Sequence, residues 1–457
     1  MTVVDEVKSR LDILDLVSQY TSLQRSGRSY KAVCPFHVEK TPSFFVFPER
    51  QSWRCFGACA TGGDVFSFLM RIENLDFSQA LKRLAQQAGV NLAESRSRKG
   101  ETDILYRINE SACEFFRDLL TSPAGKSPRA YLQKRGLTGE TIDKFQLGLS
   151  PGDGESLKSY LASKGHTREQ MALAGVITES QERGYRDLFR RRLMFPIRDA
   201  EGQLAGFGGR TLDESHLSAS LKTGPKYLNS PRSPIFDKGH ILYALYLAKD
   251  AAREGSIVIV EGYMDAIVAH QHGFSNVVAS MGTALTQQQA SLVRRLLHRP
   301  GSQPMSKGQG EVILALDPDA AGQEATLRSL EASWGVFQAR PVASTQGITL
   351  YQRVETPDLK VAPLPQGKDP DEVILESPEG WASLVKAAVP FMDYLFTTLP
   401  SRVDLNTPQG KTWLAQIIFR QIAAVPDPFQ QDHYFQRLAH LLGVSEETLQ
   451  ALSLIHI

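Results

Sequence analysis

The sequence contains no run of 18 apolar residues, and its first segment, MTVVDEVKSRLDILDLV, is interrupted by charges every few positions. It therefore lacks both a membrane-spanning helix and the continuous apolar core of a signal peptide, and we expect a cytoplasmic protein without membrane contact. An excess of charge of one sign is also missing, since the formal net charge is only +1. Any nucleic acid would have to be bound by local basic patches, because the surface as a whole is not cationic.

Cysteine is scarce as well. Only four occur, and Cys34, Cys55 and Cys59 fall within 26 residues, which is unlike a disulfide framework. Two residues separate Cys34 from His37, a gap of 17 follows, and three residues separate Cys55 from Cys59. Three thiolates and an imidazole at this spacing predict a structural Zn²⁺ site. The alternative, three reduced core cysteines beside an unrelated histidine, is less consistent with the spacing.

The length and composition predict several folded units. Hydrophobic residues make up 42% of the 457 positions, and one hydrophobic core rarely serves a chain this long. We predict a multidomain α/β and α+β protein: a small zinc-ribbon-type domain at 1–94, a flexible linker at 95–102 (SRSRKGET), a mixed basic α+β subdomain at 103–250, an α/β subdomain with a parallel sheet at 251–376, and a C-terminal helical subdomain at 377–457.

Acidic residues follow the predicted strands of the parallel sheet. Glu261 comes directly after IVIV and Asp317 directly after VILAL, so both lie at the carboxyl edge, where ligands bind in open α/β sheets. Asp319 lies two residues beyond Asp317, and GKDPDE supplies Asp369 and Asp371 at the same spacing. Single acids at such positions also cap helices. Two acids that end adjacent buried strands would repel each other without a cation, which favours a divalent-metal site for phosphoryl transfer.

EGYMD (Glu261 to Asp265) and DPDAAG (Asp317 to Gly322) resemble the paired signature of the toprim domain. Together with SMGTALT and GKDPDE, they are most similar to DnaG-type bacterial DNA primases. The resemblance implies a toprim-containing RNA polymerase core that synthesises short RNA primers from ribonucleoside triphosphates on single-stranded DNA. It also implies roles for the acids: Asp317, Asp319 and Asp369 chiefly hold Mg²⁺ or Mn²⁺, Glu261 is a further ligand or a base, and Asp265 and Asp371 are weaker candidates.

The basic middle of the chain carries further family motifs. RLMFPIRD, GFGGR, PKYLNS and FDKG occur in the order found in the primase core. The resemblance implies that a group of polar side chains lines the nucleotide and template groove, namely Arg190, Arg192, Arg210, Lys226, Tyr227, Asn229 and Lys238. Lys144, in IDKF, is a weaker candidate. The alternative for such a basic run is a solvated face.

Aromatic residues surround the predicted zinc ligands. Phe44, Phe45, Trp53 and Phe56 could stack on unpaired bases, but aromatics beside a zinc site more often form its small core. We expect most of them to be core.

Two other functions use similar units: a toprim topoisomerase or nuclease, and a non-catalytic zinc and toprim recombination mediator that clamps DNA. The sequence shows no tyrosine-nucleophile module, and mediators would lack PKYLNS and GKDPDE. Primases of this type continue into a domain that docks on the replicative helicase, whereas here RLAHLLGVSEETLQ is followed only by ALSLIHI. We expect the docking domain to be absent, the chain being truncated or ending in non-native residues.

Overall fold

The computed structural model describes residues 3–37, 39, 41–57, 59, 61–73, 75–90, 92–180, 184–212, 225–282, 285–297, 310–315, 337, 358–365, 367–425 and 427–449. Its internal contacts divide the chain into two units, Met1–Asp103 and Ile104–Ile457. Within these described ranges, no helix combines the length and the apolar character needed to cross a membrane.

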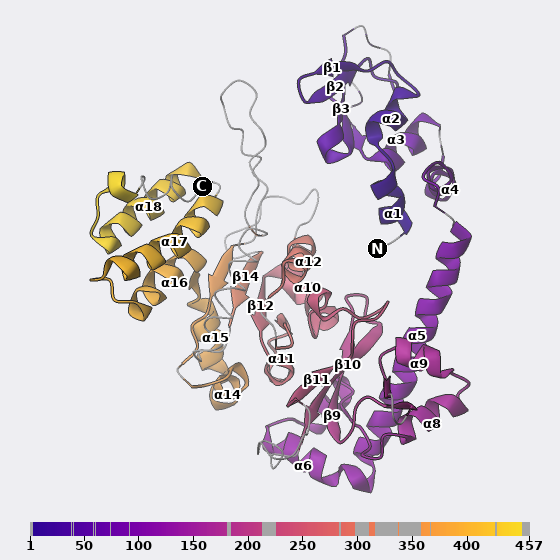
Figure 1. Cartoon of the computed structure of the whole chain (residues 1–457), viewed down its shortest axis with the longest axis vertical. Helices are drawn as coiled ribbons and strands as arrows, with labels where there is room; N and C mark the ends of the chain where they lie inside the picture. The colour runs from indigo at the N-terminus through magenta and orange to yellow at the C-terminus, as the bar shows by residue number, and fades with distance from the viewer. Residues whose placement is uncertain are drawn as a thin grey trace. The chain divides into compact units, whose positions relative to one another are not determined.

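The first unit is built on an antiparallel sheet (Figure 1). Its strands, in sheet order, are β1 (Gln24–Ser26), β2 (Ser29–Ala32), β3 (Phe44–Phe47), β4 (Ser52–Cys55) and β5 (Gly62–Gly63). Its helices are α1 (Val3–Arg10), α2 (Ile13–Ser18), η1 (Pro48–Arg50), α3 (Val65–Ile72) and α4 (Phe77–Gln87). Along β3, Phe44 and Val46 are buried while Phe45 and Phe47 are half-buried, as strand alternation requires. The core therefore lies on one face of the sheet, against α2 and α3.

Residues 33–36 form the turn that carries Cys34, because β2 ends at Ala32 and Pro35 cannot donate a ladder hydrogen bond. One segment differs from the sequence expectation. Residues 95–102, predicted as a flexible linker, lie within one long helix, α5 (Leu92–Thr121). Arginine, lysine and glutamate are good helix formers, so a polar composition does not by itself distinguish a solvated helix from a linker.

The second unit begins with helices and an antiparallel sheet of order β11-β10-β9-β6. The elements before this sheet's long strands are η2 (Pro123–Gly125), α6 (Lys126–Lys134), α7 (Gly139–Lys144), β6 (Gly148–Leu149), α8 (Ser156–Ser163), α9 (Arg168–Leu173), β7 (Ile177–Ser180) and β8 (Gly184–Asp187). They are followed by β9 (Arg192–Arg198), β10 (Leu204–Thr211), β11 (Tyr227–Asn229) and η4 (Lys238–His240). Both faces of β9 are buried: Met194 packs with α5, α8 and α9, and Phe195 packs toward the next sheet.

A second sheet has the order β13-β12-β14-β15-β16. Its elements are α10 (Leu245–Glu254), β12 (Ser256–Val260), α11 (Tyr263–Gln271), β13 (Val277–Ala279), α12 (Gln287–Leu297), β14 (Glu311–Leu314), β15 (Leu359–Val361), α14 (Pro370–Glu376), α15 (Pro378–Lys386) and β16 (Val389–Pro390). The first four strands are parallel and β16 is antiparallel. Ile257 and Ile259 pack with α10 and α12, whereas Val258 and Val260 pack with α11. The predicted α/β subdomain with a parallel sheet is confirmed.

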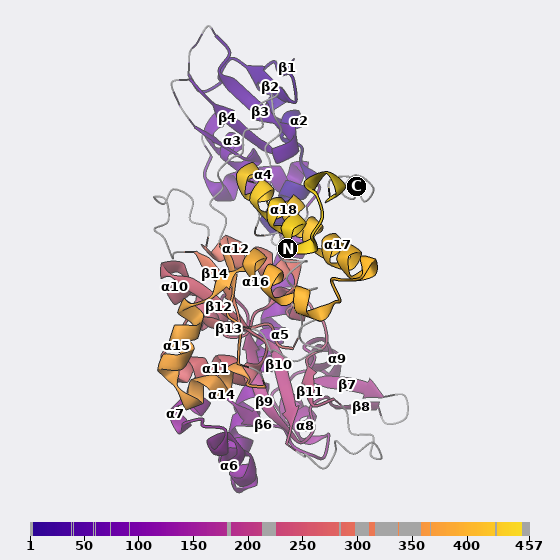
Figure 2. The ribbon, with the colours of Figure 1, turned by 90° about the vertical axis from the view of Figure 1, so that its left-hand side faces the viewer.

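The chain closes with α16 (Phe391–Thr398), η5 (Pro400–Arg402), α17 (Pro408–Ala424) and α18 (Pro428–Leu442), as the helical prediction required (Figure 2). Leu395, Leu414 and Leu438 are buried in the same cluster as Ile257. These helices therefore extend the core on one face of the second sheet. Trp413 and Phe429 remain exposed.

Candidate metal centres

The four predicted zinc ligands converge. Cys34, His37, Cys55 and Cys59 each offer one atom, and these atoms lie within 4.8 Å of one another. Cys34 Sγ is 3.6 Å from Cys59 Sγ, and Cys55 Sγ is 3.9 Å from His37 Nδ1. Tetrahedral ligands about 2.3 Å from a zinc ion are about 3.8 Å apart, so this donor set fits Zn²⁺. In the part of the chain that the structure describes, no other three-ligand group is this compact.

The strands place these ligands. Cys55 is the last residue of β4, opposite Phe44 on β3, and Cys34 lies just beyond β2. The three-residue gap before Cys59 is accommodated by Gly57, whose N–H donates to Cys55 Sγ at 3.3 Å. A Cβ atom on Gly57 would clash with Ser43 Oγ and lie 3.0 Å from His37 Nε2. A side chain at this position would therefore have to displace Ser43, Glu39 or His37.

Sequence reasoning missed Glu39, which supports the zinc site. Its Oε2 lies 3.0 Å from His37 Nε2 and accepts a hydrogen bond from Ser43 Oγ at 2.5 Å. Its Oε1 accepts the backbone N–H groups of Cys34 and Ser43 at 2.7 and 3.0 Å. The hydrogen bond from Ser43 lowers the pKa of Glu39, so the carboxylate is anionic. A carboxylate on Nε2 orients the imidazole so that Nδ1 faces the thiols. The only sequence signal was its position two residues after His37.

The two buried thiols differ in acidity. Burial raises the pKa of Cys34 to about 12. For Cys55, burial acts in the same direction but is outweighed by its hydrogen bonds with Ser43, Cys59 and Gly57, which lower its pKa to about 7. Metal binding requires thiolates, so a zinc ion would displace the remaining protons.

Glu261 lies at the carboxyl edge of the parallel strands, directly after β12. Its carbonyl accepts the N–H of Gly282 at 2.9 Å, so the SMGTALT segment after β13 meets this edge. Neighbouring β14 ends at Leu314, in register with Ile259 of β12. Asp317 and Asp319 follow β14 in the sequence but lie outside the described residues.

Asp265 and Asp371 are engaged by the protein. Asp265 Oδ2 accepts the N–H of Gly262 at 2.9 Å, and its Oδ1 accepts the N–H of Asp371 at 3.3 Å. Asp371 Oδ2 forms an ion pair with Arg135. The two aspartates are 7% and 1% exposed. Both carboxylates therefore connect elements around the acidic edge.

Asp369 is exposed at the start of α14, and its N–H donates to Glu372 Oε2 at 3.4 Å. Partial burial raises the pKa of Asp369, the negative charges of Asp371 and Glu372 add to this, and Arg135 and Lys226 oppose it. Concentrated negative charge of this kind favours a bound cation. The chemistry of this donor set therefore fits a divalent metal.

Several predicted groove residues gather around β10 and β11. The Arg210 guanidinium lies 5.1 Å from the ring centroid of Tyr131 and 5.6 Å from that of Tyr227. Asn229 Oδ1 accepts a hydrogen bond from the Tyr263 hydroxyl at 2.5 Å. Tyr263 is itself buried against Phe195, Tyr227 and Tyr243, which places this tyrosine in the packing of α11.

Arg192 differs from the other arginines of its run. It is buried, and its Nη1 donates to the carbonyls of Gly209 and Pro225 at 2.9 Å each. Arg190, by contrast, is exposed. Arg192 therefore supports the backbone beside β10 and does not face a solvent groove.

Two further predicted residues contact other elements. Lys144, at the end of α7, acts electrostatically on His270 near the C-terminal end of α11, whereas Glu261 precedes the N-terminal end. Lys238 begins η4, where the neighbouring Gly239 carbonyl accepts a hydrogen bond from Thr286 at 2.6 Å. Burial lowers the pKa of Lys238.

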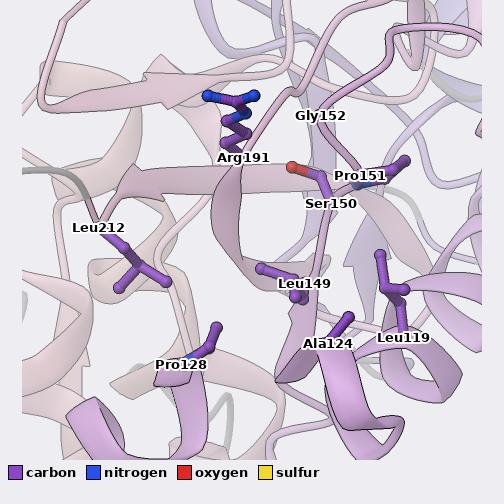
Figure 3. Close-up of a pocket in the computed structure, with 9 residues that line it drawn as sticks. All are labelled: Leu119, Ala124, Pro128, Leu149, Ser150, Pro151, Gly152, Arg191 and Leu212. Atoms are coloured by element: carbon purple, nitrogen blue, oxygen red, sulfur yellow. The ribbon is translucent and has the colours of Figure 1, made fainter. Parts of the chain in front are cut away.

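A pocket of about 470 Å³ lies between α5, η2, β6 and the start of β9 (Figure 3). Its walls are mostly apolar, and among the described residues Arg191 is the one charged residue that lines it. None of the acidic residues lines it. Sequence reasoning missed this pocket because its apolar walls come from dispersed elements.

Comparisons with known families cover most of the chain. Residues 1–100 match the CHC2 zinc finger, and residues 115–249 match the N-terminal domain of the DNA primase catalytic core. Residues 255–343 match the Toprim domain, whose presence implies metal-dependent catalysis, and residues 392–447 match the DnaB-helicase binding domain of primase.

The last match shows that the expected absence of a helicase-docking region was wrong. The matched segment covers α16, α17 and α18, which we assigned to the helical subdomain, while we expected docking helices only beyond it. The prediction failed because periodic leucines such as Leu414 reveal the buried face of a helix. They carry no information about a partner on the opposite face.

Relatives agree with these matches over the full sequence. The chain is 36% identical over 457 residues to the DNA primase of Clostridium acetobutylicum, covering 98% of this chain and 69% of that protein. Its structure is similar to the zinc-binding and RNA polymerase domains of Aquifex aeolicus primase, with a TM-score of 0.58, 29% identity and coverage of 98% and 99%. It is also similar to a DnaG primase catalytic domain bound to ssDNA, with a TM-score of 0.59, 30% identity and coverage of 75% and 99%. The chain therefore belongs to the DnaG-type bacterial DNA primases, nucleotidyltransferases that synthesise RNA primers.

Proposed function

We propose that this primase extends RNA on a single-stranded DNA template with Mg²⁺ or Mn²⁺ held by Glu261, Asp317, Asp319 and Asp369, in the bacterial cytoplasm. The main support comes from Glu261, which lies at the carboxyl edge of the parallel strands. Asp369 is exposed in the same subdomain. When bound, the cations lower the barrier to attack of a 3′ hydroxyl on an α-phosphate, with pyrophosphate as the leaving group.

The basic residues contact the triphosphate and the template backbone. Lys226 is exposed and its charge acts on Asp369, which supports contact with the triphosphate beside the metal site. Arg210, whose guanidinium lies near two tyrosine rings, is suited to contact phosphate. We assign Tyr227, whose ring packs beside Tyr263, to this same groove. Arg190, Lys144 and Lys238 bind the template backbone from the surrounding surface.

Arg192 and Asn229 position the groove without facing it. Arg192 binds backbone carbonyls beside β10, and Asn229 binds the Tyr263 hydroxyl. Their contribution is to hold β10 and β11 in place.

The zinc domain offers a second contact for the template. Lys31, Phe45 and Arg54 are cross-strand neighbours on the face of the sheet away from the core. Phe56 is 62% exposed, and its ring centroid lies 5.5 Å from that of Phe45. Aromatic rings interleaved with cations are suited to stacking on unpaired bases and holding their phosphates. Phe44 and Trp53, by contrast, are buried in the core.

A primer-free synthesis assay tests this proposal. Zinc-loaded protein is incubated with single-stranded DNA, labelled ribonucleoside triphosphates and Mg²⁺ or Mn²⁺. We expect labelled oligonucleotides from the wild type, and a loss of at least about 100-fold for Glu261→Gln and Asp369→Asn, because each removes a metal ligand.

Glu376→Gln is the matched control, since Glu376 is an exposed carboxylate at the other end of α14 whose ion pair with Lys368 lies on the surface. It should retain wild-type activity. Equal activity of Asp369→Asn and Glu376→Gln would contradict the proposed ligand set.

A further inference from the structure

Arg135 connects the end of α6 to the acidic edge. It follows α6 directly, and its guanidinium forms an ion pair with Asp371, which lies 236 positions later in the sequence. The Asp371 side chain is 1% exposed, and its other oxygen, Oδ1, has no hydrogen-bond partner among the described residues. A buried carboxylate of this kind depends on its one cation, because charge removed from water must be compensated.

The ion pair leads by short steps to the proposed metal ligands. The N–H of Asp371 donates to Asp265 Oδ1 at 3.3 Å, and Asp265 Oδ2 accepts the N–H of Gly262 at 2.9 Å. Gly262 is the residue after Glu261, and Asp371 lies two residues after Asp369. Arg135 therefore lies at one end of a chain of contacts that reaches both ligands.

The residues after Arg135 hold the same two helices. Gln271, at the end of α11, donates from Nε2 to the carbonyl of Gly136 at 2.8 Å and accepts the N–H of Thr138 at 2.9 Å. A Cβ atom on Gly136 would lie 2.6 Å from Leu375 Cδ2 on α14. Gly136 also has a φ of +81°, which favours glycine. Residues 135–138 thus contact α11 and α14 together, and these helices pack against each other.

We propose that Arg135 is a positioning residue for primer synthesis. By pairing with Asp371, it fixes the first turn of α14 against the start of α11, and so sets the separation of Glu261 and Asp369 before a metal binds. The inference rests on the proposed metal site and adds a residue outside it. Displacement of a ligand by about 1 Å costs an enzyme roughly 100-fold in rate, so a residue with no contact to substrate has a large effect through such a link.

Direct metal binding tests this role. The zinc-loaded 457-residue chain is titrated with Mn²⁺ without substrate, and free Mn²⁺ is measured by electron paramagnetic resonance. Arg135→Ala should weaken Mn²⁺ binding by about 10- to 100-fold, the range for losing a residue that orients metal ligands. The midpoint of thermal unfolding is measured in parallel.

Arg198→Ala is the matched control. Arg198 forms an ion pair with Glu110, with Nη1 2.6 Å from Oε1, and it also donates to the Gly202 carbonyl and to Gln146 Oε1, none of which belongs to the acidic site. It should lose thermal stability and keep wild-type Mn²⁺ affinity. If Arg135→Ala behaves in the same way as Arg198→Ala, the positioning role is refuted.

Two further variants complete the test of the positioning role. Where Arg135→Ala does not fold, Arg135→Lys retains the charge but not the planar fork, and it should bind Mn²⁺ about 3-fold or more weakly; wild-type affinity in this variant overturns the inference. In an Asp371→Asn background, Arg135→Ala should add no further loss, because both changes break one link; additive losses overturn it. A wild type that binds no Mn²⁺ contradicts the proposed metal site itself, whereas wild-type binding that Arg135→Ala leaves unchanged contradicts this inference alone.

Discussion

Gly57 illustrates how closely single residues are constrained at the zinc site. In Gly57→Ala, the new Cβ would clash with Ser43 Oγ and lie 2.9 Å from Glu39 Oε2. Because Glu39 orients His37, we expect about 10-fold weaker zinc binding, measured by competition with a chromogenic chelator. Gly100→Ala is the control, since a Cβ on Gly100 meets nothing within 4 Å. Equal zinc retention by both variants would show that the clash is relieved without moving Glu39.

At the residue scale, the sequence identified functional groups whose members lie close together in the sequence. Cys34 and Cys55 were identified because zinc requires particular atoms at short spacings. Glu39 was not, because its contact with His37 depends on how the intervening turn folds. Arg192 was assigned to the groove through the resemblance to the primase core, but neither that resemblance nor an arginine run reveals which side chains point inward. The structure shows Arg192 bound to the carbonyl of Gly209.

At the scale of elements, the packing of β10 against α11 depends on one small residue, Gly208. A Cβ atom on Gly208 would clash with Tyr263 Oη and lie 2.5 Å from Cζ. The Tyr263 ring cannot easily move, because its centroid lies 4.9 Å from those of both Phe195 and Tyr243. Gly208→Ala should therefore destabilise the protein by about 1–3 kcal/mol and reduce primer synthesis, since α11 follows Glu261.

Thermal unfolding and the primer-free assay measure these effects of Gly208→Ala. Gly139→Ala serves for comparison, because Gly139 begins α7 and has open space around it. An unfolding midpoint for Gly208→Ala equal to that of Gly139→Ala would be incompatible with this packing.

At the element scale, the apolar run of β12 was predictable because a parallel strand covered on both faces needs apolar residues at every position. Ile257 and Val258 indeed face opposite sides of the sheet. The antiparallel β16 was not predictable, because its two residues carry no periodic pattern. The helix through 95–102 was missed since helix and linker share a polar composition there.

For the whole molecule, the division into two units predicts that each unit responds differently to loss of zinc. The first unit has a small core beside the metal ligands, whereas the second has its own larger cores. After zinc is removed with a chelator, backbone amides of β2, β3 and β4 should lose protection from hydrogen exchange, and those of β9 and β12 should keep it. Zinc added back should restore the protection. Loss of protection in β12 would show that the second unit depends on the metal.

The order of the folded parts was visible in the sequence because each carries its own pattern: zinc ligands, a basic middle, strand and helix alternation, then helices. The helicase-binding match at 392–447 was not anticipated. Trp413 and Phe429 are exposed in this segment, and hydrophobic periodicity predicts only the buried face of a helix, so it does not reveal what a partner would contact.

The antiparallel strand β16 has a consequence for how readily the edge of this sheet can pair with another chain. β15 would otherwise end the described sheet with unpaired backbone groups, and β16 covers them through the pairs Val361 with Val389 and Lys360 with Pro390. Pro390 has no N–H group, so it offers no donor for another strand. A fragment ending before Val389 would expose the β15 edge and would be prone to aggregate through intermolecular strand pairing.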